Sequence, residues 1–480
     1  MKKGETAEGR VSRVLFPDKA EAVTPEGEKV LVRYALPGQE ISFRVTKKRK
    51  ERMEGVLLDV LEPSPEEIPA DCSRASACGG CLYRTLPYEA QLALKDGQMR
   101  TLLGEYAEYY EGILPSPEVN AYRNKVELTF GDEVKDGPLM LGMHKKGSFY
   151  DIADISDCRI MHKDMKLAAA CVLAHFRELG TPFYHRLRHT GVLRHLLLRR
   201  SRSEGELLVA LVCADPGNGA ADLKLDELAR KLKALPLEGS LAGFLFMRNN
   251  SVADVVQSEH TEIIFGKDEI AEKLLGLTFH ITPFSFFQTN SAGAEVLYET
   301  VREFVGDTDG KVIYDLYSGT GTIAQILAPV AEQVTGVEIV EEAVEAARVN
   351  AAQNGLSNCT FIAGDVLKVV DELEKKPDLL VLDPPRDGIH PKALPKLIGY
   401  GCGRIVYVSC KPTSLVRDLP AFLDAGYEIE RIRSVDMFPG TGGIETVCLL
   451  SNRKPDAKIR IDVDLEEYYR IKDKKQSKES

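Results

Sequence analysis

The sequence predicts a multi-domain protein: a small OB-like β-barrel, a central α+β domain and a C-terminal Rossmann-like α/β domain. Its 480 residues are enough for roughly two to four domains. Short segments of alternating polarity occupy residues 1–61, a mixed pattern covers 62–270, and strands alternate with helices over 271–451. A charged tail, 452–480, follows, and we expect it to be poorly ordered.

The expected barrel rests on four strand-like runs, 9–14, 20–24, 29–34 and 40–45, separated by proline and glycine turns. Closing such short strands into a barrel removes their exposed edges. Small OB-like barrels often bind nucleic acid, although a fold alone does not establish a function. The proline-rich stretch 62–69 is the expected linker to the next domain.

The central range combines a helical stretch near 86–110 with strand-like runs at 125–130, 192–199, 207–213 and 243–247. This order favours an α+β domain. The helical part near 86–110 is also a candidate for packing on the C-terminal domain.

The C-terminal range alternates apolar strand cores with helices, which is typical of a doubly wound α/β sheet. The expected strands are 311–316, 334–339, 378–382, 404–408 and 445–450, with helices at 322–331 and 341–354. Ligands bind such sheets at the carboxyl ends of the strands.

The charge distribution gives no global sign of nucleic-acid binding, because the formal net charge is −11. Two local patches could neutralise phosphates, although a solvated surface is an equally good interpretation of each. One is the basic cluster 47–52. The other is the run 181–202, which has no acidic residue and contains Arg186, Arg188, Arg194, Arg199, Arg200 and Arg202.

No apolar stretch approaches the length needed to cross a bilayer, and the N-terminus has no apolar signal region. We therefore expect a cytoplasmic monomer without membrane contact. In that compartment the ten cysteines argue against a disulfide framework.

A glycine-rich turn between an expected strand and helix reads Asp315-x-x-x-Gly319-x-Gly321. It is neither the dinucleotide-binding pattern nor a P-loop. After the next strand, at 334–339, Glu338 could accept hydrogen bonds from both hydroxyls of a ribose. After a further strand that precedes residue 378, Asp365 could meet an adenine amino group. This ordered set resembles the S-adenosylmethionine (SAM) site of class I methyltransferases.

Two further strand ends carry reactive groups. Asp383-Pro384-Pro385-Arg386 follows the expected strand at 378–382, and Cys410, in Ser409-Cys410-Lys411-Pro412, follows the one at 404–408. A thiolate at that position could act as a nucleophile, for example toward the electron-poor C6 of a uracil ring. Buried cysteines are usually inert parts of a core, an interpretation that fits Cys402 and Cys448 better.

A cluster of cysteines follows the linker. Cys72, Cys78 and Cys81 lie in one loop that Gly79 and Gly80 curve tightly, and Cys158 lies far downstream. Four thiolates suit zinc or an iron–sulfur cluster, and a three-plus-one arrangement is more typical of [4Fe–4S]. The alternative is four unrelated reduced cysteines.

Together these motifs resemble the RNA uracil-5-methyltransferase family, the tRNA and 23S rRNA m5U enzymes, from the barrel (a TRAM domain there) to Leu450. The matching segments are 193–196, 284–290, 383–386, 409–412 and 444–447. The resemblance implies a SAM site built from Gln288, Asp315, Tyr317, Gly319, Gly321, Glu338, Asp365 and Asp383.

The resemblance also implies a mechanism. Cys410 would be the nucleophile, Glu445 the general base, and Asp383 would position the uracil. The four cysteines match the [4Fe–4S] ligands of the family's rRNA enzymes one by one, which makes 23S rRNA the preferred partner and a tRNA T-loop the alternative.

One departure from the family concerns the segment before Glu445, where the family often has two histidines and this chain has Gly440 and Gly443. It is the only sequence support for an RNA-binding protein that has lost catalysis. A redox enzyme built on the cysteine cluster is another alternative, although no partner site for electron transfer is recognisable.

Overall fold

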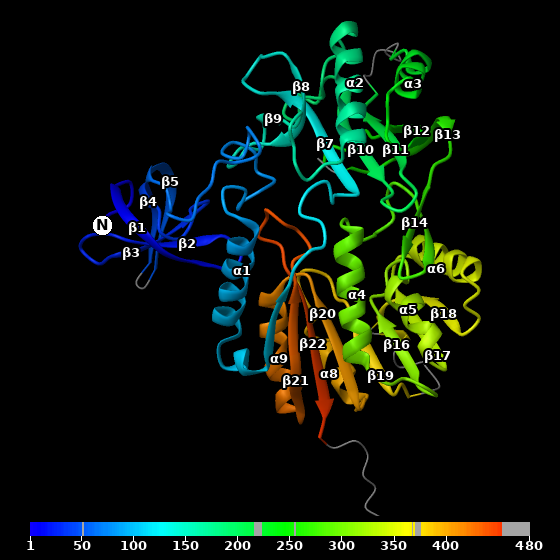
Figure 1. Ribbon diagram of the computed structural model, residues 1–480. Coiled ribbons are helices and arrows are strands. Elements are labelled where there is room, and N and C mark those ends of the chain that lie inside the picture. Colours follow the sequence, from blue (N-terminus) through cyan, green and yellow to red (C-terminus); the bar gives the residue numbers. More distant parts are fainter. Residues whose placement is uncertain (50–51, 216–222, 254–255, 367, 370–375, 454–480) are drawn as a thin grey trace, which may run out of the picture.

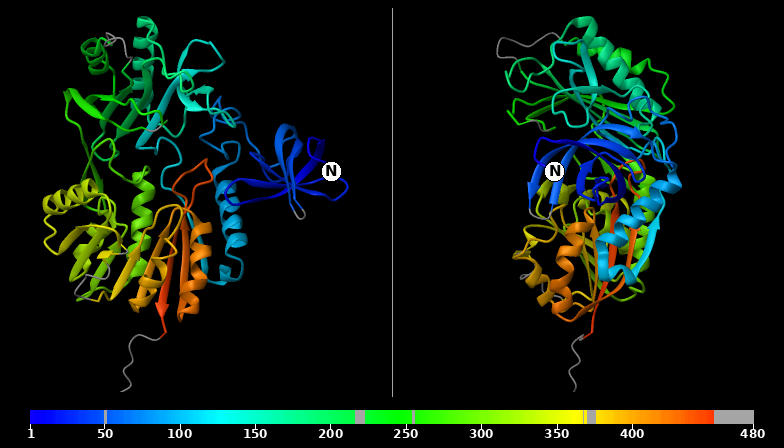
Figure 2. Two further views of the ribbon diagram at one scale, coloured as in Figure 1. Left: turned by 180° about the vertical axis from the view of Figure 1, so that it is seen from behind. Right: turned by 90° about the vertical axis from the view of Figure 1, so that its left-hand side faces the viewer.

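The computed structural model describes residues 1–49, 52–215, 223–253, 256–366, 368–369 and 376–453 (Figure 1). The barrel lies to one side, a sheet-and-helix domain forms the top, and a second α/β unit forms the base; Figure 2 shows the same parts from behind and from the side. Most of the expected tail, from 454 onward, lies outside the described residues. Within the described part, no helix has the length and apolarity to cross a membrane.

The N-terminal barrel is closed, with the strand order β1-β2-β3-β5-β4. Its strands are β1 (Thr6–Leu15), β2 (Lys19–Val23), β3 (Lys29–Arg33), β4 (Glu40–Arg49) and β5 (Arg52–Glu62). Alternate residues such as Val11, Ile41 and Phe43 fill its core. The sequence did not predict β5, because Val56, Leu58, Val60 and Leu61 all lie largely exposed on it and leave no clean alternation.

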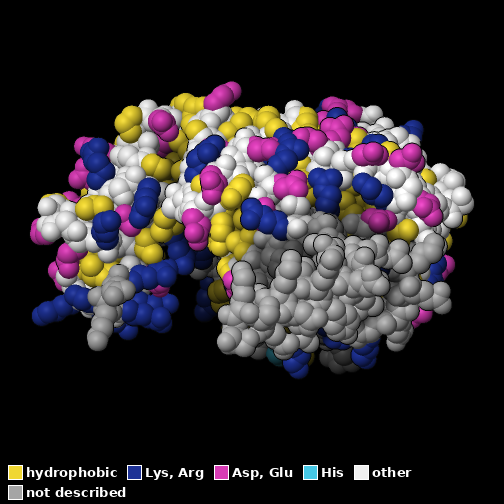
Figure 3. Space-filling view, turned by 90° about the horizontal axis from the view of Figure 1, so that it is seen from below, with side chains coloured by type: hydrophobic (Ala, Val, Ile, Leu, Met, Phe, Trp, Pro, Cys, Tyr) yellow, Lys and Arg dark blue, Asp and Glu magenta, His cyan; other side chains and the backbone are white. Residues whose placement is uncertain are grey.

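Residues 47–49 and 52 of the basic cluster lie at the end of the β4–β5 hairpin, and its residues 50 and 51 lie outside the described residues. Figure 3 shows lysine and arginine side chains gathered at the lower edge of the barrel, on the left of that view. Two of the cluster's cations, Lys47 and Arg52, share Glu54 as a partner, so part of this charge is internally balanced.

The central domain is a seven-stranded sheet in the order β13-β12-β11-β10-β7-β8-β9. Its strands are β7 (Lys125–Asp132), β8 (Leu139–His144), β9 (Ile152–Asp154), β10 (Leu193–Arg200), β11 (Glu206–Cys213), β12 (Ser240–Arg248) and β13 (His260–Gly266). Helices α2 (Lys163–Leu179) and α3 (Leu225–Lys233) cover one face. The other face packs on the C-terminal domain through residues such as Leu197 and Leu245, which is why β10 and β11 are almost continuously buried.

The arginine-rich run 181–202 is not the continuous surface patch that its composition suggested. Arg194 and Arg199 are 3% and 1% exposed. Arg194 donates to the carbonyl oxygens of Asn249, Ser251 and Ala253, and Arg199 donates to those of Pro283 and Ser285. Arg200 pairs with buried Asp164, and Arg202 with Glu118. Arg194, Arg199 and Arg200 therefore hold other segments together, whereas Arg188 and Arg202 are exposed.

The C-terminal sheet has eight strands in the order β18-β17-β16-β19-β20-β22-β21-β6. The strands from its C-terminal range are β16 (Val312–Leu316), β17 (Gln333–Glu338), β18 (Cys359–Ala363), β19 (Leu379–Leu382), β20 (Arg404–Ser409), β21 (Tyr427–Val435) and β22 (Glu445–Asn452). The first five pair in parallel, and β22 is antiparallel to both β20 and β21. The parallel strands bring their carboxyl ends to one edge of the sheet.

Helices cover both faces of this sheet. On one face are α4 (Ser291–Val305), α5 (Thr322–Leu327) and α6 (Glu341–Gln353), and on the other are α8 (Leu394–Gly399) and α9 (Pro412–Asp424). A small hairpin, β14 (Ile270–Leu274) with β15 (Leu277–Ile281), packs between the central sheet and α4.

The helical stretch near 86–110 is an integral part of the C-terminal domain. Helix α1 (Tyr88–Leu103) and the 3₁₀ turn at Gly104–Tyr109 lead into β6 (Tyr110–Leu114), which pairs in parallel with β21. Buried Met99, Leu103 and Tyr110 join the core beneath α8 and α9. The chain thus contributes α1 and β6 to the C-terminal domain before it forms the strands of the central domain. The range 62–270 expected for the central domain therefore includes a segment that belongs to the C-terminal sheet.

This crossing predicts a local effect of Met99→Ala. Met99 is fully buried, and truncating such a side chain costs about 2–5 kcal/mol. Hydrogen–deuterium exchange should accelerate in β20, β21 and β22 but not in β10 and β11. Met165→Ala, an equally buried change in α2, should give the reverse pattern. Slowed or unchanged exchange in β21 after Met99→Ala would contradict the assignment of α1 to this domain.

Candidate active site

A cavity of about 1320 Å³ opens at the carboxyl edge of the C-terminal sheet. All three parts of the chain contribute to its wall. Arg33 and Tyr34 come from the barrel, Gly79 and Gly80 from the cysteine loop, and the remainder mainly from the sheet edge. The predicted residues that line it are Gln288, Asp315, Tyr317, Gly319, Glu338, Asp383, Cys410 and Glu445.

The glycine-rich turn after β16 has a backbone that explains its sequence. Tyr317, Gly319 and Gly321 all have positive φ, at 67°, 54° and 72°. A Cβ on Gly321 would lie 2.3 Å from the Phe361 ring, so this position is closed to other residues. Gly321 therefore shapes the turn from behind and does not line the cavity. Buried Asp315 secures the turn to α5 by accepting a hydrogen bond from the Ala324 amide at 2.9 Å.

Glu338 ends β17 and lies directly beside this turn. Its carboxylate accepts hydrogen bonds from the amides of Gly319, Ile339 and Val340 at 3.0, 2.8 and 3.0 Å. The carboxylate is thereby fixed at the cavity wall. Asp365, after β18, does not line the cavity. It lies near Tyr317, where burial first and the Asp365 charge second raise the pKa of the tyrosine to about 12.

The segment 284–290, between β15 and α4, forms the opposite wall. Gln288 is 8% exposed, whereas the Phe286 ring is 67% exposed at the cavity. The Thr320 hydroxyl donates to the Phe286 carbonyl at 3.0 Å, and the Asn124 side-chain amide donates to the Gln288 carbonyl at 2.8 Å. The segment is thus fastened both to the glycine-rich turn and to the central domain.

Cys410, Glu445 and Asp383 meet at the end of neighbouring strands. Ser409 of β20 is in register with Thr446 of β22, so Cys410 and Glu445 are opposite each other one step further along the antiparallel pair. Asp383 follows β19, the strand next to β20. The sheet therefore brings a thiol and two carboxyl groups to one wall of the cavity.

Burial dominates the electrostatics of these groups. It raises the pKa of Asp383 to about 7, and burial together with the Asp383 charge raises the pKa of Glu445 well above its usual range. Burial first, and the Glu445 and Asp383 charges next, raise the pKa of Cys410 to about 11, while the Arg386 guanidinium acts in the opposite direction. Glu445 is 3% exposed, and its Oε2 atom has no hydrogen-bond partner among the described residues. A buried acceptor at a cavity wall is costly unless a ligand satisfies it.

Sequence reasoning missed Tyr298 of α4. This side chain is 5% exposed, lines the cavity and lies near Asp383, Glu445 and Asp315, and burial raises its pKa well above the usual value. Its place in an apolar helical pattern gave no signal, because a core tyrosine would fit the same pattern.

The two glycines at Gly440 and Gly443 fit the loop that they occupy. Gly440 has a φ of 81°, and a Cβ there would lie 2.7 Å from Arg84. A Cβ on Gly443 would lie 2.7 Å from the Phe438 ring. A side chain at either position would therefore have to displace Arg84 or Phe438.

The four predicted cluster cysteines are half-buried, and their charges act on one another. Burial is the main reason that the pKa of each thiol is raised, and the other thiols add to it. Among the described side chains, no group of three or more could hold a single metal ion. Four thiols in one another's electrostatic range are still the donor set of a [4Fe–4S] cluster, so the residues fit that group chemically.

Comparison with known proteins gives a consistent result. A family described as tRNA (uracil-5-)-methyltransferase matches residues 239–453. An "uncharacterized RNA methyltransferase" of Clostridium tetani is 44% identical over 456 residues, covering 94% of this chain and 99% of that protein. One of Caldanaerobacter subterraneus is 44% identical over 428 residues, covering 88% and 94%.

Among solved structures, the Pyrococcus abyssi tRNA (uracil-54, C5)-methyltransferase in complex with S-adenosyl-L-homocysteine is similar, with a TM-score of 0.72 and 28% identity. The match covers 92% of this chain and 100% of that one. The expected family is confirmed over nearly the whole length: the chain belongs to the RNA uracil-5-methyltransferase family.

Proposed function

We propose that this enzyme transfers the methyl group of SAM to C5 of a uridine in 23S rRNA. One observation carries the proposal: Cys410, Glu445 and Asp383 line the same cavity as the glycine-rich turn and Glu338. A nucleophile, a base and a cofactor-type loop thus share one site. The unsatisfied Oε2 of Glu445 marks where a uracil ring would complete the wall.

SAM would lie along the glycine-rich turn, where Gly319 lets the ligand approach the backbone closely. Glu338 is fixed for hydrogen bonds to the ribose hydroxyls, and Gln288 and Tyr317 flank the same space. Asp365 does not line the cavity, and it would contact the adenine only at the far end of the SAM site. When bound, SAM supplies an electrophilic methyl group on a sulfonium.

The proposed reaction begins with the Cys410 thiolate, which forms a bond to C6 of the uracil and turns the ring into an enolate. C5 then bonds to the methyl carbon as the sulfur–methyl bond of SAM breaks, leaving S-adenosylhomocysteine. Glu445 removes the C5 proton, and elimination breaks the bond between C6 and the sulfur, which restores the thiolate. Asp383 would hold the edge of the ring.

The electrostatics of the site suit a reaction that starts only with substrate in place. With a pKa near 11, the Cys410 thiol is protonated at neutral pH in the free protein. Arg386 is the group that favours the thiolate. The raised pKa of Glu445 makes its carboxylate, once formed, a stronger base toward the C5 proton.

The RNA would lie across the barrel, the cysteine loop and the C-terminal domain, because all three border the cavity. The target uridine would have to leave its stack to reach Cys410. We favour 23S rRNA because the cysteine cluster resembles that of the rRNA enzymes. A tRNA T-loop is the second candidate, supported by the family description and by the Pyrococcus abyssi tRNA enzyme.

RNA containing 5-fluorouridine should trap the enzyme, because fluorine at C5 cannot leave as a proton. With radiolabelled SAM, the wild type should form a denaturation-resistant protein–RNA adduct, and Cys410→Ala should form none. Comparing 23S rRNA fragments with tRNA T-arm minihelices should show adducts on the former. Efficient trapping on T-arms alone would move the assignment to tRNA, and no adduct on any RNA would reject the mechanism.

Two substitutions should move the pKa of Cys410 in opposite directions. Glu445→Gln removes a negative neighbour and should lower it, whereas Arg386→Met removes a positive neighbour and should raise it. The pH dependence of Cys410 alkylation, followed on its own peptide by mass spectrometry, measures both. The Cys171 peptide serves as an internal control. Shifts in the same direction for both variants would contradict the arrangement.

The cysteine cluster predicts that protein purified without oxygen contains close to four iron atoms per chain, as a [4Fe–4S] site requires. Cys72→Ser should lose most of this iron and the visible absorbance of the cluster. Cys171→Ser, a half-buried cysteine on α2, should retain both. Normal iron content in Cys72→Ser would reject the ligand set.

A further inference from the structure

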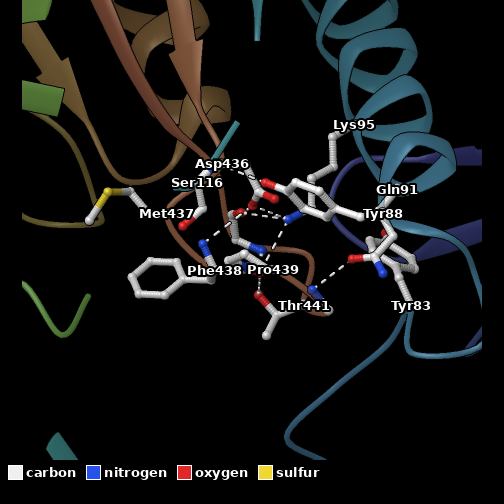
Figure 4. A network of polar contacts seen from close by, with 12 residues as sticks. Tyr83, Tyr88, Gln91, Lys95, Ser116, Asp436, Met437, Phe438, Pro439 and Thr441 are labelled. Atoms are coloured by element: carbon white, nitrogen blue, oxygen red, sulfur yellow. Dashed lines mark hydrogen bonds and ion pairs between the residues drawn. The ribbon is translucent and has the colours of Figure 1, made fainter. Parts of the chain in front are cut away.

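The loop that leads into Glu445 is held by a buried ion pair from a distant part of the chain. This loop, residues 436–444, connects β21 to β22, and Glu445 is the first residue of β22. Figure 4 shows Lys95 pointing from α1 into the loop, toward Asp436. Both side chains are fully buried, and the Lys95 ammonium lies 2.5 Å from Asp436 Oδ1.

The ammonium also closes the loop on itself. Besides Asp436, it donates to the carbonyl oxygens of Phe438 at 3.2 Å and Gly443 at 3.3 Å. A lysine ammonium has three donors, and here each has an acceptor from the same loop. Lys95 thereby ties the first residues of the loop to the residue two places before Glu445.

The rest of the loop is anchored by other elements. The Gly440 carbonyl accepts hydrogen bonds from the amides of Leu82 and Tyr83, directly after the cluster cysteine Cys81, and the Gly440 amide donates to Gln91 of α1 at 2.8 Å. The Tyr122 hydroxyl donates to the Pro439 carbonyl at 2.9 Å. These contacts fix the outer turn. Within the loop, the Thr441 hydroxyl donates to the Phe438 carbonyl and accepts from the Gly443 amide, so it joins the same two ends as Lys95, which does so from a distant element and with a charge.

One side of the 436–444 loop faces the active-site cavity. Phe438, Thr441, Gly442 and Gly443 line the cavity together with Glu445. The Glu445 carboxyl is nearly enclosed, and within the described part of the chain its Oε2 atom has no hydrogen-bond partner. Among the described residues no group hydrogen-bonds to that oxygen, so its orientation depends on the backbone that enters β22.

We propose that Lys95 and Asp436 are positioning residues for proton abstraction: their ion pair sets the 436–444 loop so that Glu445 faces the C5 proton of the target uridine. The inference rests on the proposed role of Glu445 as the base. Lys95 does not touch the substrate, since it lies behind the loop. It acts on the last chemical stage, after the bond to Cys410 and the methyl transfer.

The two stages can be separated with RNA that carries [5-³H]uridine and with ¹⁴C-methyl SAM in single turnovers. In the wild type, methyl incorporation and tritium release should match. In Lys95→Met/Asp436→Asn, which removes both buried charges together, methyl incorporation should persist while tritium release slows about 10-fold to 100-fold. A methylated protein–RNA adduct should then accumulate on ordinary uridine.

The matched control is Arg200→Met/Asp164→Asn, which neutralises a buried ion pair of the central domain. It should leave the ratio of tritium release to methyl incorporation unchanged, because that ratio does not depend on the fraction of folded protein. Lys95→Arg provides a second variant should the double variant not fold, since a planar guanidinium cannot direct three donors from one nitrogen. It should shift the ratio in the same direction.

A ratio that stays at the wild-type value in the folded Lys95 variants, while Glu445→Gln changes it, overturns the positioning role and leaves the proposed function intact. A ratio unaffected by Glu445→Gln itself would instead remove Glu445 as the base, and the proposed function would fail with it. The two failures are therefore distinguishable in one set of assays.

Discussion

The site depends on the burial of acidic side chains at one edge of a parallel sheet. Asp315, Asp383 and Glu445 all lie in or behind the same cavity, and each has a pKa raised by loss of water. Like charges at such a place repel, and Cys410 cannot easily ionise beside them. In a less rigid structure these acidic side chains and Cys410 would move apart. They are kept together by the strands, by the helices on both faces of the sheet and by the anchored loops.

That rigidity comes from segments that are far apart in the sequence. Helix α1 and β6 reach the C-terminal sheet before the central domain is formed, and β6 completes its edge beside β21. The barrel is joined to the same region, because the Tyr83 hydroxyl donates to the Pro17 carbonyl at 2.8 Å. Displacing the cysteine loop would therefore disturb the barrel contact and the 436–444 loop together. A cluster that braces this loop could matter for catalysis without any electron transfer.

The sequence was most informative where a local pattern of residues recurs in a fixed order along the chain. The parallel strands of the C-terminal sheet and their glycine-rich turn could be predicted because hydrophobic runs and glycines repeat in a fixed order. The same order placed Asp383, Cys410 and Glu445 at strand ends, where the structure has them in one cavity. Strand β5, the crossing of β6 and buried Tyr298 could not be predicted, since each depends on long-range packing. The arginine-rich run was interpreted wrongly as a surface patch for the same reason. The density of charge in a sequence does not reveal that Arg194 and Arg199 are buried and donate hydrogen bonds to carbonyl oxygens.

The net charge of −11 is compatible with an RNA substrate because the screening length at physiological salt is only about 8 Å. RNA phosphates at the cavity would therefore be attracted by the nearby cations, and the net charge of the whole chain would have little effect on them. Arg33 stacks on Tyr34 at 5.2 Å, Lys146 approaches the same ring at 5.7 Å, and Arg123 lies over Phe438 at 5.5 Å. Tyr34, Arg123 and Phe438 all line the cavity. Such paired cations and rings favour unstacked bases over a regular duplex. An acidic exterior would weaken binding to other RNA, so discrimination would come from the few cations and rings at the mouth of the site.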